Sequence, residues 1–338
     1  MIKGAVIGLG KMGISHAAII GANPETDLSA VCDVSSFVLS GFAKFSKVKT
    51  YTDYKKMMDK EPLDFIVVAT PTRFHYPIVK YAVNKRIHIF CEKPFMLDTS
   101  QGQEIVEMVE KAGLINQVGY HNHFIGTFRE CKRLLSEKVL GDLFHFSGEA
   151  YGPVITKEKA GSWRADPSQG GGCLYDYASH VINLIQEIIG NIGEVHGSYL
   201  KSFYSKGVED AVYSLLQTTE GLTGVLSVNW SDETYRKMST SLTIQGRKGK
   251  IICDATEVKI YLKEENKKEN LVKGWNIKYI TDLATPVQYY LRGEEYSAQM
   301  DYFITSIKEN KKGTMNTFSQ AYETDLAIKK ILSSKVTA

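Results

Sequence analysis

The first 33 residues of this 338-residue chain constrain its fold most strongly. An apolar run, 2–7, has the length of a buried strand and leads into Gly8-Leu9-Gly10-Lys11-Met12-Gly13. A helical stretch, 14–22, follows, and a second apolar run, 28–32, ends at Asp33. Strand, glycine-rich turn, helix, strand and acidic residue at this spacing are typical of a dinucleotide-binding unit. We therefore expect a pyrophosphate at the helix start, held by Gly8, Gly10, Lys11, Met12 and Gly13.

Asp33 bears on which dinucleotide binds. A carboxylate at the end of the second strand accepts hydrogen bonds from the ribose 2′-OH and repels a 2′-phosphate. The next residues, 34–37, contain no arginine or lysine that would pair with such a phosphate. The sequence therefore favours NAD over NADP.

Composition excludes several other classes of protein. The net charge of +3 is too small to indicate a nucleic-acid partner. No apolar run approaches the ~18 residues of a membrane span, and the N-terminus enters a strand directly, without a signal peptide. The five cysteines contain no C-x-x-C pair, which argues for reduced thiols and against structural zinc. We expect a cytoplasmic protein without a membrane or nucleic-acid partner.

The chain length predicts about two domains. Over residues 1–119 strands alternate with helices, which predicts an α/β Rossmann domain with a parallel sheet. Residues 120–338 predict an α+β domain with an open, mainly antiparallel sheet and helices on one face. Within it we expect helices over 124–140, 176–189, 295–308 and 319–333, strands over 143–151, 194–203, 211–218, 223–230, 239–245, 250–253 and 258–262, and an exposed excursion over 264–274.

Unusual residues follow several strands of the predicted parallel sheet. Thr70-Pro71, Glu92-Lys93-Pro94 and Tyr120-His121 each come directly after an apolar run. Ligands of open α/β sheets lie outside the carboxyl ends of the strands, so these residues point to one crevice. We expect Thr70, Pro71, Glu92 and Lys93 to contact the cofactor, and His75 to line the crevice or cap its helix.

A second cluster follows the glycine run 170–172. Asp176 and His180 are four residues apart and share one face of a helix, with Asn183 on the same face. A histidine suits proton transfer near neutral pH, and a neighbouring carboxylate would orient its ring. The alternative for this cluster is a polar stripe on a solvated helix, and the alternative for Lys93 is a solvated lysine.

Taken in order, these motifs resemble the glucose–fructose oxidoreductase / inositol dehydrogenase (GFO/IDH/MocA) family. The resemblance rests on Gly8 to Gly13, on Glu92-Lys93-Pro94, and on G-G-G-x-L-x-D ahead of His180, with Trp163-Arg164 before the glycines. It implies NAD-dependent oxidation or reduction of a polyol, sugar or sugar nucleotide, and a cis Lys93–Pro94 bond. By position it implies a catalytic set of Lys93, Asp176 and His180, and a substrate site formed by Lys93, Tyr120, His121, Trp163, Arg164, Asp176 and His180.

The sequence departs from the family pattern near the expected substrate. Ala178 replaces a usual glycine, Asn183 a frequent aspartate, and the run 121–124 a frequent arginine-phenylalanine pair. None of these changes affects the catalytic set, so they point to an unusual substrate. His121 and His123 alone lack the further ligands of a metal site, and we expect no metal.

Two other functions and one assembly state are compatible with the same motifs. One alternative is a glycoside hydrolase of the same family that uses tightly held NAD for transient oxidation. The other is a non-catalytic NAD-sensing regulator, which would be expected to have lost the lysine and histidine. A sheet with helices on only one face leaves the other face open, which predicts a homodimer or homotetramer.

Overall fold

The computed structural model describes residues 1–158, 163–287 and 289–336. The chain folds into two compact units. The first unit comprises Met1–His121 and Pro286–Tyr322, and the second comprises Asn122–Thr285 and Glu323–Ala338.

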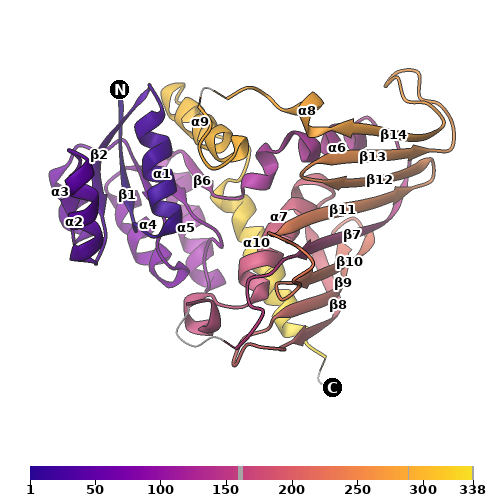
Figure 1. Ribbon diagram of the computed structural model, residues 1–338, viewed down its shortest axis with the longest axis horizontal. Helices are drawn as coiled ribbons and strands as arrows, with labels where there is room; N and C mark the ends of the chain where they lie inside the picture. Colours follow the sequence, from indigo (N-terminus) through magenta and orange to yellow (C-terminus); the bar gives the residue numbers. More distant parts are fainter. Residues whose placement is uncertain (159–162, 288, 337–338) are drawn as a thin grey trace. The chain divides into compact units, whose positions relative to one another are not determined.

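The first unit is built on a parallel six-stranded sheet with the order β3-β2-β1-β4-β5-β6 (Figure 1). This order is the doubly wound arrangement expected when strands and helices alternate. The prediction of a parallel Rossmann sheet is confirmed. The strands are β1 (Ile2–Ile7), β2 (Thr26–Cys32), β3 (Lys49–Tyr51), β4 (Phe65–Val68), β5 (His88–Cys91) and β6 (Asn116–Val118).

Local signals set the ends of the helices in this unit. Ser35, Asp53 and Asp98 cap helices by accepting hydrogen bonds from backbone N–H groups of the first turn. Gly113, at a φ of 66°, ends the longest of the five helices that connect the strands. These helices are α1 (Lys11–Ala22), α2 (Ser36–Phe45), α3 (Tyr54–Lys60), α4 (His75–Asn84) and α5 (Thr99–Ala112).

Helix α9 (Glu294–Lys308) also belongs to the first unit, although it lies beyond residue 119 in the sequence. Its Phe303 packs edge-on against Phe65 of β4 and Phe90 of β5, with ring centroids 5.8 Å apart in both pairs. The start of α10 (Phe318–Ser333) also packs on the first unit, because the ring centroids of Phe318 and Phe95 lie 4.5 Å apart. Burial of these rings holds the C-terminal segment on the first sheet.

The second unit contains an eight-stranded sheet with the order β14-β13-β12-β11-β7-β10-β9-β8 (Figure 1). Strands β7 and β10 pair in parallel, and the remaining neighbours are antiparallel, which confirms the predicted mainly antiparallel sheet. The strands are β7 (Leu143–Tyr151), β8 (Ile192–Lys201), β9 (Ala211–Thr218), β10 (Thr223–Asn229), β11 (Ser239–Gly246), β12 (Gly249–Asp254), β13 (Glu257–Leu262) and β14 (Gly274–Tyr279).

Strand β14 was missed because the residues before it are highly charged. It pairs only with β13 and places Trp275, Ile277 and Tyr279 on the open face of the sheet, where each is about half exposed. The short helix α8 (Ile280–Leu283) follows it directly. The strand itself alternates between apolar and polar residues, so its pattern is present in the sequence directly after the charged segment.

Helices cover the other face of this sheet. Alternate strand residues pack with α6 (Gly126–Ser136) and α7 (Ser179–Ile188) in one hydrophobic core. The predicted helix over 124–140 ends earlier, because Lys138 and Gly141 adopt positive φ angles. The predicted helix over 176–189 is not α-helical at its start: residues Leu174–Ala178 form a π-helical turn before α7.

Candidate functional site

The glycine turn of the first unit is shaped by close backbone packing. Gly8 has a φ of 91°, and a Cβ on it would lie 2.7 Å from the carbonyl oxygen of Ala69. A Cβ on Gly13 would lie 1.7 Å from the carbonyl oxygen of Gly8. Gly10 is the N-cap of α1, and a Cβ there would have no described atom within 4 Å. The turn is therefore tight on its inner side and open at the helix N-terminus, where an anionic group would meet free N–H donors.

Asp33 lies beside this turn and is tied to it. Its Oδ2 accepts a hydrogen bond from the Leu9 N–H at 2.7 Å, and its Oδ1 accepts one from the Ser35 N–H at 2.8 Å. The residue is partly exposed, and each carboxylate oxygen keeps a second acceptor position. Asp33 can thus shape the turn and still accept hydrogen bonds from a ribose. Lys11 and Met12 form the first turn of α1, with Lys11 exposed and Met12 partly buried.

Thr70, Pro71 and His75 form the turn after β4. The His75 ring is fully buried, with Nε2 3.0 Å from the Thr70 carbonyl oxygen and Nδ1 3.1 Å from the Phe95 carbonyl oxygen. Burial lowers the pKa of His75, and this effect outweighs the two carbonyl contacts, which favour the charged ring. A neutral ring donates its single N–H to one of these two carbonyl groups and so ties the turn to a neighbouring segment. Within the described residues, the buried hydroxyl of Thr70 has no hydrogen-bond partner. An unsatisfied hydroxyl at this edge suits a ligand that supplies the missing contact.

The turn after β5 carries Glu92, Lys93 and Pro94. The Lys93–Pro94 peptide bond is cis, as the resemblance implies. Glu92 is buried, and its Oε1 lies 2.6 Å from Nε2 of His16 on α1. Lys93 is partly buried rather than fully solvated.

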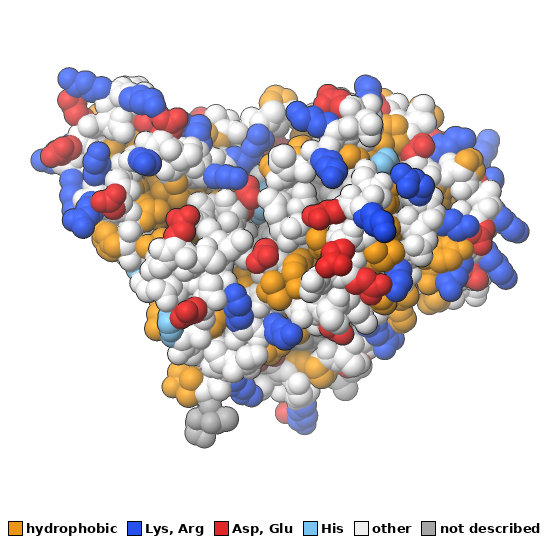
Figure 2. Space-filling model, turned by 180° about the vertical axis from the view of Figure 1, so that it is seen from behind, with side chains coloured by type: hydrophobic (Ala, Val, Ile, Leu, Met, Phe, Trp, Pro, Cys, Tyr) orange, Lys and Arg blue, Asp and Glu red, His pale blue; other side chains and the backbone are white. Residues whose placement is uncertain are grey.

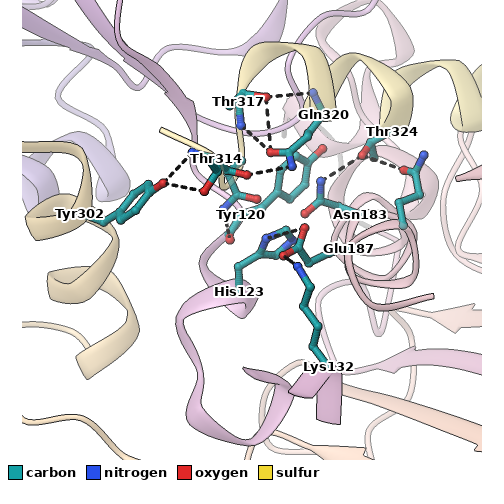
Figure 3. A network of polar contacts seen from close by, with 12 residues as sticks. Tyr120, His123, Lys132, Asn183, Glu187, Tyr302, Thr314, Thr317, Gln320 and Thr324 are labelled. Carbon is teal, nitrogen blue, oxygen red and sulfur yellow. Dashed lines mark hydrogen bonds and ion pairs between the residues drawn. The ribbon is translucent and has the colours of Figure 1, made fainter. Parts of the chain in front are cut away.

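Tyr120 and His121 follow β6 and contact the returning C-terminal segment. The carbonyl oxygen of Tyr120 accepts a hydrogen bond from Asn316 at 2.7 Å (Figure 3). The ring of His121 stacks on Tyr296 of α9, with centroids 4.7 Å apart. The guanidinium of Arg292 lies 5.1 Å from the centre of the same tyrosine ring. A stack of three side chains therefore covers this edge of the first unit.

In the second unit, the glycine run 170–172 wraps around two neighbouring chain segments. A Cβ on Gly171 would lie 2.4 Å from the carbonyl oxygen of Arg164, and one on Gly172 would lie 2.3 Å from Oε1 of Glu209. The same Glu209 oxygen accepts the N–H of Leu174 at 2.8 Å. Glycines are needed here because a side chain at Gly171 would strike the backbone of Arg164, and one at Gly172 would displace the carboxylate that accepts the Leu174 N–H.

Asp176 and His180 are buried on that helix, with 6% and 5% of their surfaces exposed. Nε of Arg164 donates a hydrogen bond to Oδ2 of Asp176 at 2.8 Å, and the Arg164 guanidinium also lies 4.6 Å from the centre of the Trp163 ring. The alternative of a solvated polar stripe does not fit such burial. Asp176 lies in the π-helical turn and His180 in α7, a local geometry that recurs at functional sites.

Asn183 lies one turn after His180 and belongs to a buried polar network. Its Nδ2 donates to Oγ1 of Thr324 at 3.1 Å (Figure 3). The buried ring of His123 faces Glu187, with Nδ1 3.9 Å from Oε2, and Lys132 pairs with the other oxygen of Glu187 at 2.5 Å. Burial lowers the pKa of His123 to about 4, so this ring is neutral at neutral pH.

Models of one protein family match both parts of the chain. A model described as an oxidoreductase family with an NAD-binding Rossmann fold matches residues 2–120, and the GFO/IDH/MocA C-terminal domain matches residues 128–252. The chain belongs to the GFO/IDH/MocA family of oxidoreductases. The first unit thus carries the NAD-binding Rossmann domain of this family.

Solved structures of this family share the fold. Levoglucosan dehydrogenase in complex with NADH and levoglucosan superposes with a TM-score of 0.88 at 19% identity, covering 98% of this chain and 96% of that one. The WlbA dehydrogenase of Chromobacterium violaceum, in complex with NADH and UDP-GlcNAcA, gives a TM-score of 0.84 at 19% identity, covering 98% and 93%.

Curated relatives are similarly distant in sequence. The 2,7-anhydro-N-acetylneuraminate hydratase of Escherichia coli is 26% identical over 76% of this chain and 68% of its own length. The D-glucoside 3-dehydrogenase of the same organism is 25% identical over 56% of this chain and 54% of its own length. The chain therefore spans about half the length of the second of these relatives.

The structure of this GFO/IDH/MocA protein also bears on its expected partners. On the face drawn in Figure 2, Lys and Arg side chains are interspersed with Asp and Glu. In the part of the chain that the structure describes, no helix is long and apolar enough to cross a membrane. No three His, Cys, Asp or Glu side chains among these residues form a metal-binding group. All five cysteines are buried, and none of them forms a disulfide bond in the structure.

Three residues near the candidate site were missed by sequence reasoning. They are His16 beside Glu92, Glu209 at the helix that carries Asp176, and Tyr296 on His121. None lies in a motif of its own, and each reaches its partner across a long stretch of sequence. The glycine at 172 is an indirect signal for Glu209, because a carboxylate occupies the space that a side chain would fill.

Proposed function

We propose that this GFO/IDH/MocA protein is an NAD-dependent dehydrogenase that transfers a hydride between NAD and a secondary alcohol or ketone of a polyol, sugar or sugar nucleotide. The observation that carries the proposal is the turn at the start of α1, where an open N-terminus lies beside Asp33. The names of the relatives support a sugar substrate, since they include levoglucosan dehydrogenase and D-glucoside 3-dehydrogenase.

The residues of the first unit suit NAD. The backbone N–H groups at the start of α1 would bind the pyrophosphate, and Asp33 would accept hydrogen bonds from the adenosine ribose. Thr70, Pro71, His75 and Glu92 would shape the nicotinamide end, with the Thr70 hydroxyl available to a ligand. When bound, NAD supplies the hydride acceptor or donor. The absence of a cationic residue in 34–37 favours NAD over NADP.

The remaining chemistry is proton transfer and charge stabilisation. We assign proton transfer to His180, because an imidazole near neutral pH can accept the hydroxyl proton as hydride leaves. Asp176, held by Arg164, would stabilise the imidazolium that forms. Lys93 would stabilise the negative charge that develops on the substrate oxygen. Tyr120, His121, Trp163 and Arg164 would contribute to the substrate site.

The second unit has a further proposed role in assembly. The helix-free face of its sheet carries apolar and aromatic side chains that are between 37% and 53% exposed. Burial of such a face against a second copy would remove a large apolar area from water. We propose a homodimer or homotetramer built through this face. The side chains are Tyr199, Tyr213, Leu215, Val225, Tyr261, Trp275, Ile277 and Tyr279.

The two alternative functions are less well supported. A regulator without catalysis would have no need for a buried Asp176 and His180. A glycoside hydrolase would retain these groups, but the similar solved structures include two dehydrogenases in complex with NADH and a sugar or sugar nucleotide.

The test is a substrate panel. Inositols, free sugars, anhydrosugars, alkyl glucosides and UDP-sugars are each incubated with the purified protein and NAD, and absorbance is followed at 340 nm. We expect NADH formation with at least one class, and a rate that is lower by roughly 10²–10⁴-fold in His180→Ala. Release of a free sugar from a glycoside without net NADH would instead establish the hydrolase. Binding of NADH without turnover of any compound would favour the regulator.

A further inference from the structure

A buried pair of titratable side chains lies within the first unit. His16, in the second turn of α1, is fully buried, and Glu92, directly after β5, is 8% exposed. Nε2 of His16 and Oε1 of Glu92 are 2.6 Å apart, a short and strong contact. Taking a carboxylate out of water costs several kcal/mol, and only good hydrogen bonds offset that cost, so this pair is not incidental.

The surroundings hold the Glu92 carboxylate in one position. A Cβ on Gly119 would lie 3.1 Å from both of its oxygens, so the carboxylate packs directly over this glycine. The ring of His16 is in turn packed on Phe90, with centroids 5.1 Å apart. The second oxygen of Glu92 accepts the backbone N–H of Lys93 at 3.3 Å. Glu92 therefore joins α1 to the backbone of Lys93.

The hydrogen-bonding pattern indicates where the proton lies. Among the described residues, Nδ1 of His16 has no hydrogen-bond partner, and the atom is buried. A second N–H at this nitrogen would be an unsatisfied buried donor, which is costly. The favoured state is a neutral imidazole that donates from Nε2 to an ionised carboxylate. The pair then carries one negative charge.

Other titratable groups face Glu92 as well. Three of them interact electrostatically with the Glu92 carboxylate: Lys93 in the same turn, His75 on α4 and Tyr296 on α9. The guanidinium of Arg292 lies over the ring of Tyr296. Burial opposes the ionisation of Glu92, but the hydrogen bond from His16 and the positive charge of Lys93 hold its pKa below the usual value. His16 contacts the Glu92 carboxylate directly, through the side-chain hydrogen bond at its Nε2.

We propose that His16 is a positioning residue for Lys93. It acts through Glu92, whose carboxylate it keeps ionised and fixed, so that the turn presents the Lys93 ammonium beside a permanent negative charge. The hydrogen bond from the backbone N–H of Lys93 to Glu92 keeps the turn in place. This inference rests on the proposed function only in the role given to Lys93.

The first test compares two substitutions of His16. In His16→Gln the amide nitrogen takes the place of Nε2 and still donates to Glu92, whereas His16→Leu fills the space without a donor. The protonation of Glu92 is followed by NMR of 13C-carboxyl-labelled glutamate from pH 5 to pH 8, its signal being assigned with Glu92→Gln. We expect Glu92 to stay ionised at pH 6 in the wild type and in His16→Gln, and to be protonated in His16→Leu.

The second readout is the pH profile of turnover on a substrate from the panel. Because one pKa unit changes the ionised fraction tenfold, we expect kcat/KM of His16→Leu to fall about tenfold more than that of the wild type between pH 8 and pH 6. His16→Gln should follow the wild type. Lys80→Gln, which breaks the Lys80–Glu104 ion pair of the same unit, is the matched control and should also follow the wild type.

A third variant tests the pair without touching His16. Gly119→Ala pushes against the carboxylate from the other side and should lower kcat with little change in NADH affinity. An ionised Glu92 at pH 6 in His16→Leu, or a pH profile of that variant equal to the wild type, overturns the proposal. If the wild type acts on no compound of the panel, the proposed function fails, while the carboxyl signal still decides whether His16 holds the charge.

Discussion

The carboxylate of Asp176 accepts a 2.8 Å hydrogen bond from Nε of Arg164, twelve residues earlier in the chain. Asp176 is buried, whereas the Arg164 side chain is 37% exposed. The glycine run between them makes this contact possible, since a side chain at Gly171 would strike the Arg164 carbonyl group. Asp176 thus has a cationic partner besides the histidine that the sequence motif suggests.

The first prediction concerns this ion pair. Arg164→Met leaves the buried carboxylate without its cation, and a hydrogen bond to a charged group contributes about 1.5–3 kcal/mol. We expect a loss near the lower end of that range in the free energy of unfolding, because solvent screens the half-exposed guanidinium. Urea titration at pH 7 measures it, with Arg247→Met, at an exposed pair with Asp142, as the control. Equal stability of Arg164→Met and the control would contradict the assignment.

The second prediction concerns cofactor choice. Asp33 repels a 2′-phosphate, so NADH should bind at least about tenfold more tightly than NADPH, a difference of about 1.4 kcal/mol. Asp33→Ala should narrow the gap mainly by weakening NADH. It also removes the hydrogen bonds to Leu9 and Ser35, so the fold of the turn should be checked by limited proteolysis. Fluorescence titration gives both affinities, and equal values for the wild type would refute the argument.

The third prediction concerns the catalytic set. His180→Ala should lower turnover by roughly 10²–10⁴-fold, the range for a positioned acid or base, while NADH affinity barely changes. Lys93→Ala should also lower turnover, and Lys93→Arg should not fully restore it, because the two cations differ in geometry. Asp176→Asn should shift the acidic limb of the pH profile to lower pH, since a lost negative charge lowers the pKa of His180.

A surface histidine provides the control for these variants. His196 is exposed on β8, so His196→Ala should keep wild-type turnover. If His180→Ala retains more than half of the wild-type rate while its circular dichroism is unchanged, His180 is not the proton acceptor.

The fourth prediction concerns the pH dependence of stability. Burial lowers the pKa of His123 to about 4, against about 6.5 in an unfolded chain. The unfolded state therefore binds a proton below pH 6.5 that the folded state does not, and stability falls as pH decreases from 6.5 towards 4. At pH 5 the cost is about 2 kcal/mol, at 1.36 kcal/mol for each unit.

Replacing the histidine tests this account. The loss of stability between pH 7.5 and pH 5, measured by urea unfolding, should be about 2 kcal/mol smaller in His123→Gln than in the wild type. His196→Gln, at the exposed site, should leave the loss unchanged. An equal loss in all three proteins would show that His123 is not the group that titrates.

The fifth prediction concerns assembly. A dimer or tetramer built through the open face of the second sheet should dissociate when charges are placed on that face. We expect light scattering at micromolar concentration to show an oligomer for the wild type and a monomer for a Trp275→Glu, Ile277→Glu double variant. The control is Phe37→Glu, which changes an exposed side chain of the first unit. A monomeric wild type would remove the basis for the proposal.

Much of the fold follows from local patterns. The glycine turn, the caps at Ser35, Asp53 and Asp98, and the alternating strands are each encoded within a few residues. The π-helical turn at Leu174 is a local feature that was nevertheless missed, because it differs from an α-helix by one residue per hydrogen bond and has no composition signal. Strand β14 was missed although its apolar residues alternate with polar ones, because the charged segment that precedes it predicts an exposed loop.

In the candidate site too, some residues follow from local motifs and others are placed only by contacts between distant segments. Lys93, Asp176 and His180 could be proposed from the sequence because their motifs are short and ordered along the chain. The contacts that hold the neighbouring residues in place were not predicted. Glu92, next to Lys93, contacts a histidine 76 residues away, and the N–H of Leu174, two residues before Asp176, donates to a carboxylate 35 residues away. Neither contact leaves a periodic signal in the sequence.

The sequence by itself therefore determined the two sheets, the NAD-binding Rossmann domain and the motifs to which we assign the chemistry, because period, capping and glycine geometry act over one or two turns of chain. Only the tertiary structure showed that α9 returns to the first unit and that His16, Arg164 and Glu209 each satisfy a buried charge or donor. The physical reason is that a buried polar group must find a partner, and which residue provides it depends on packing between distant segments.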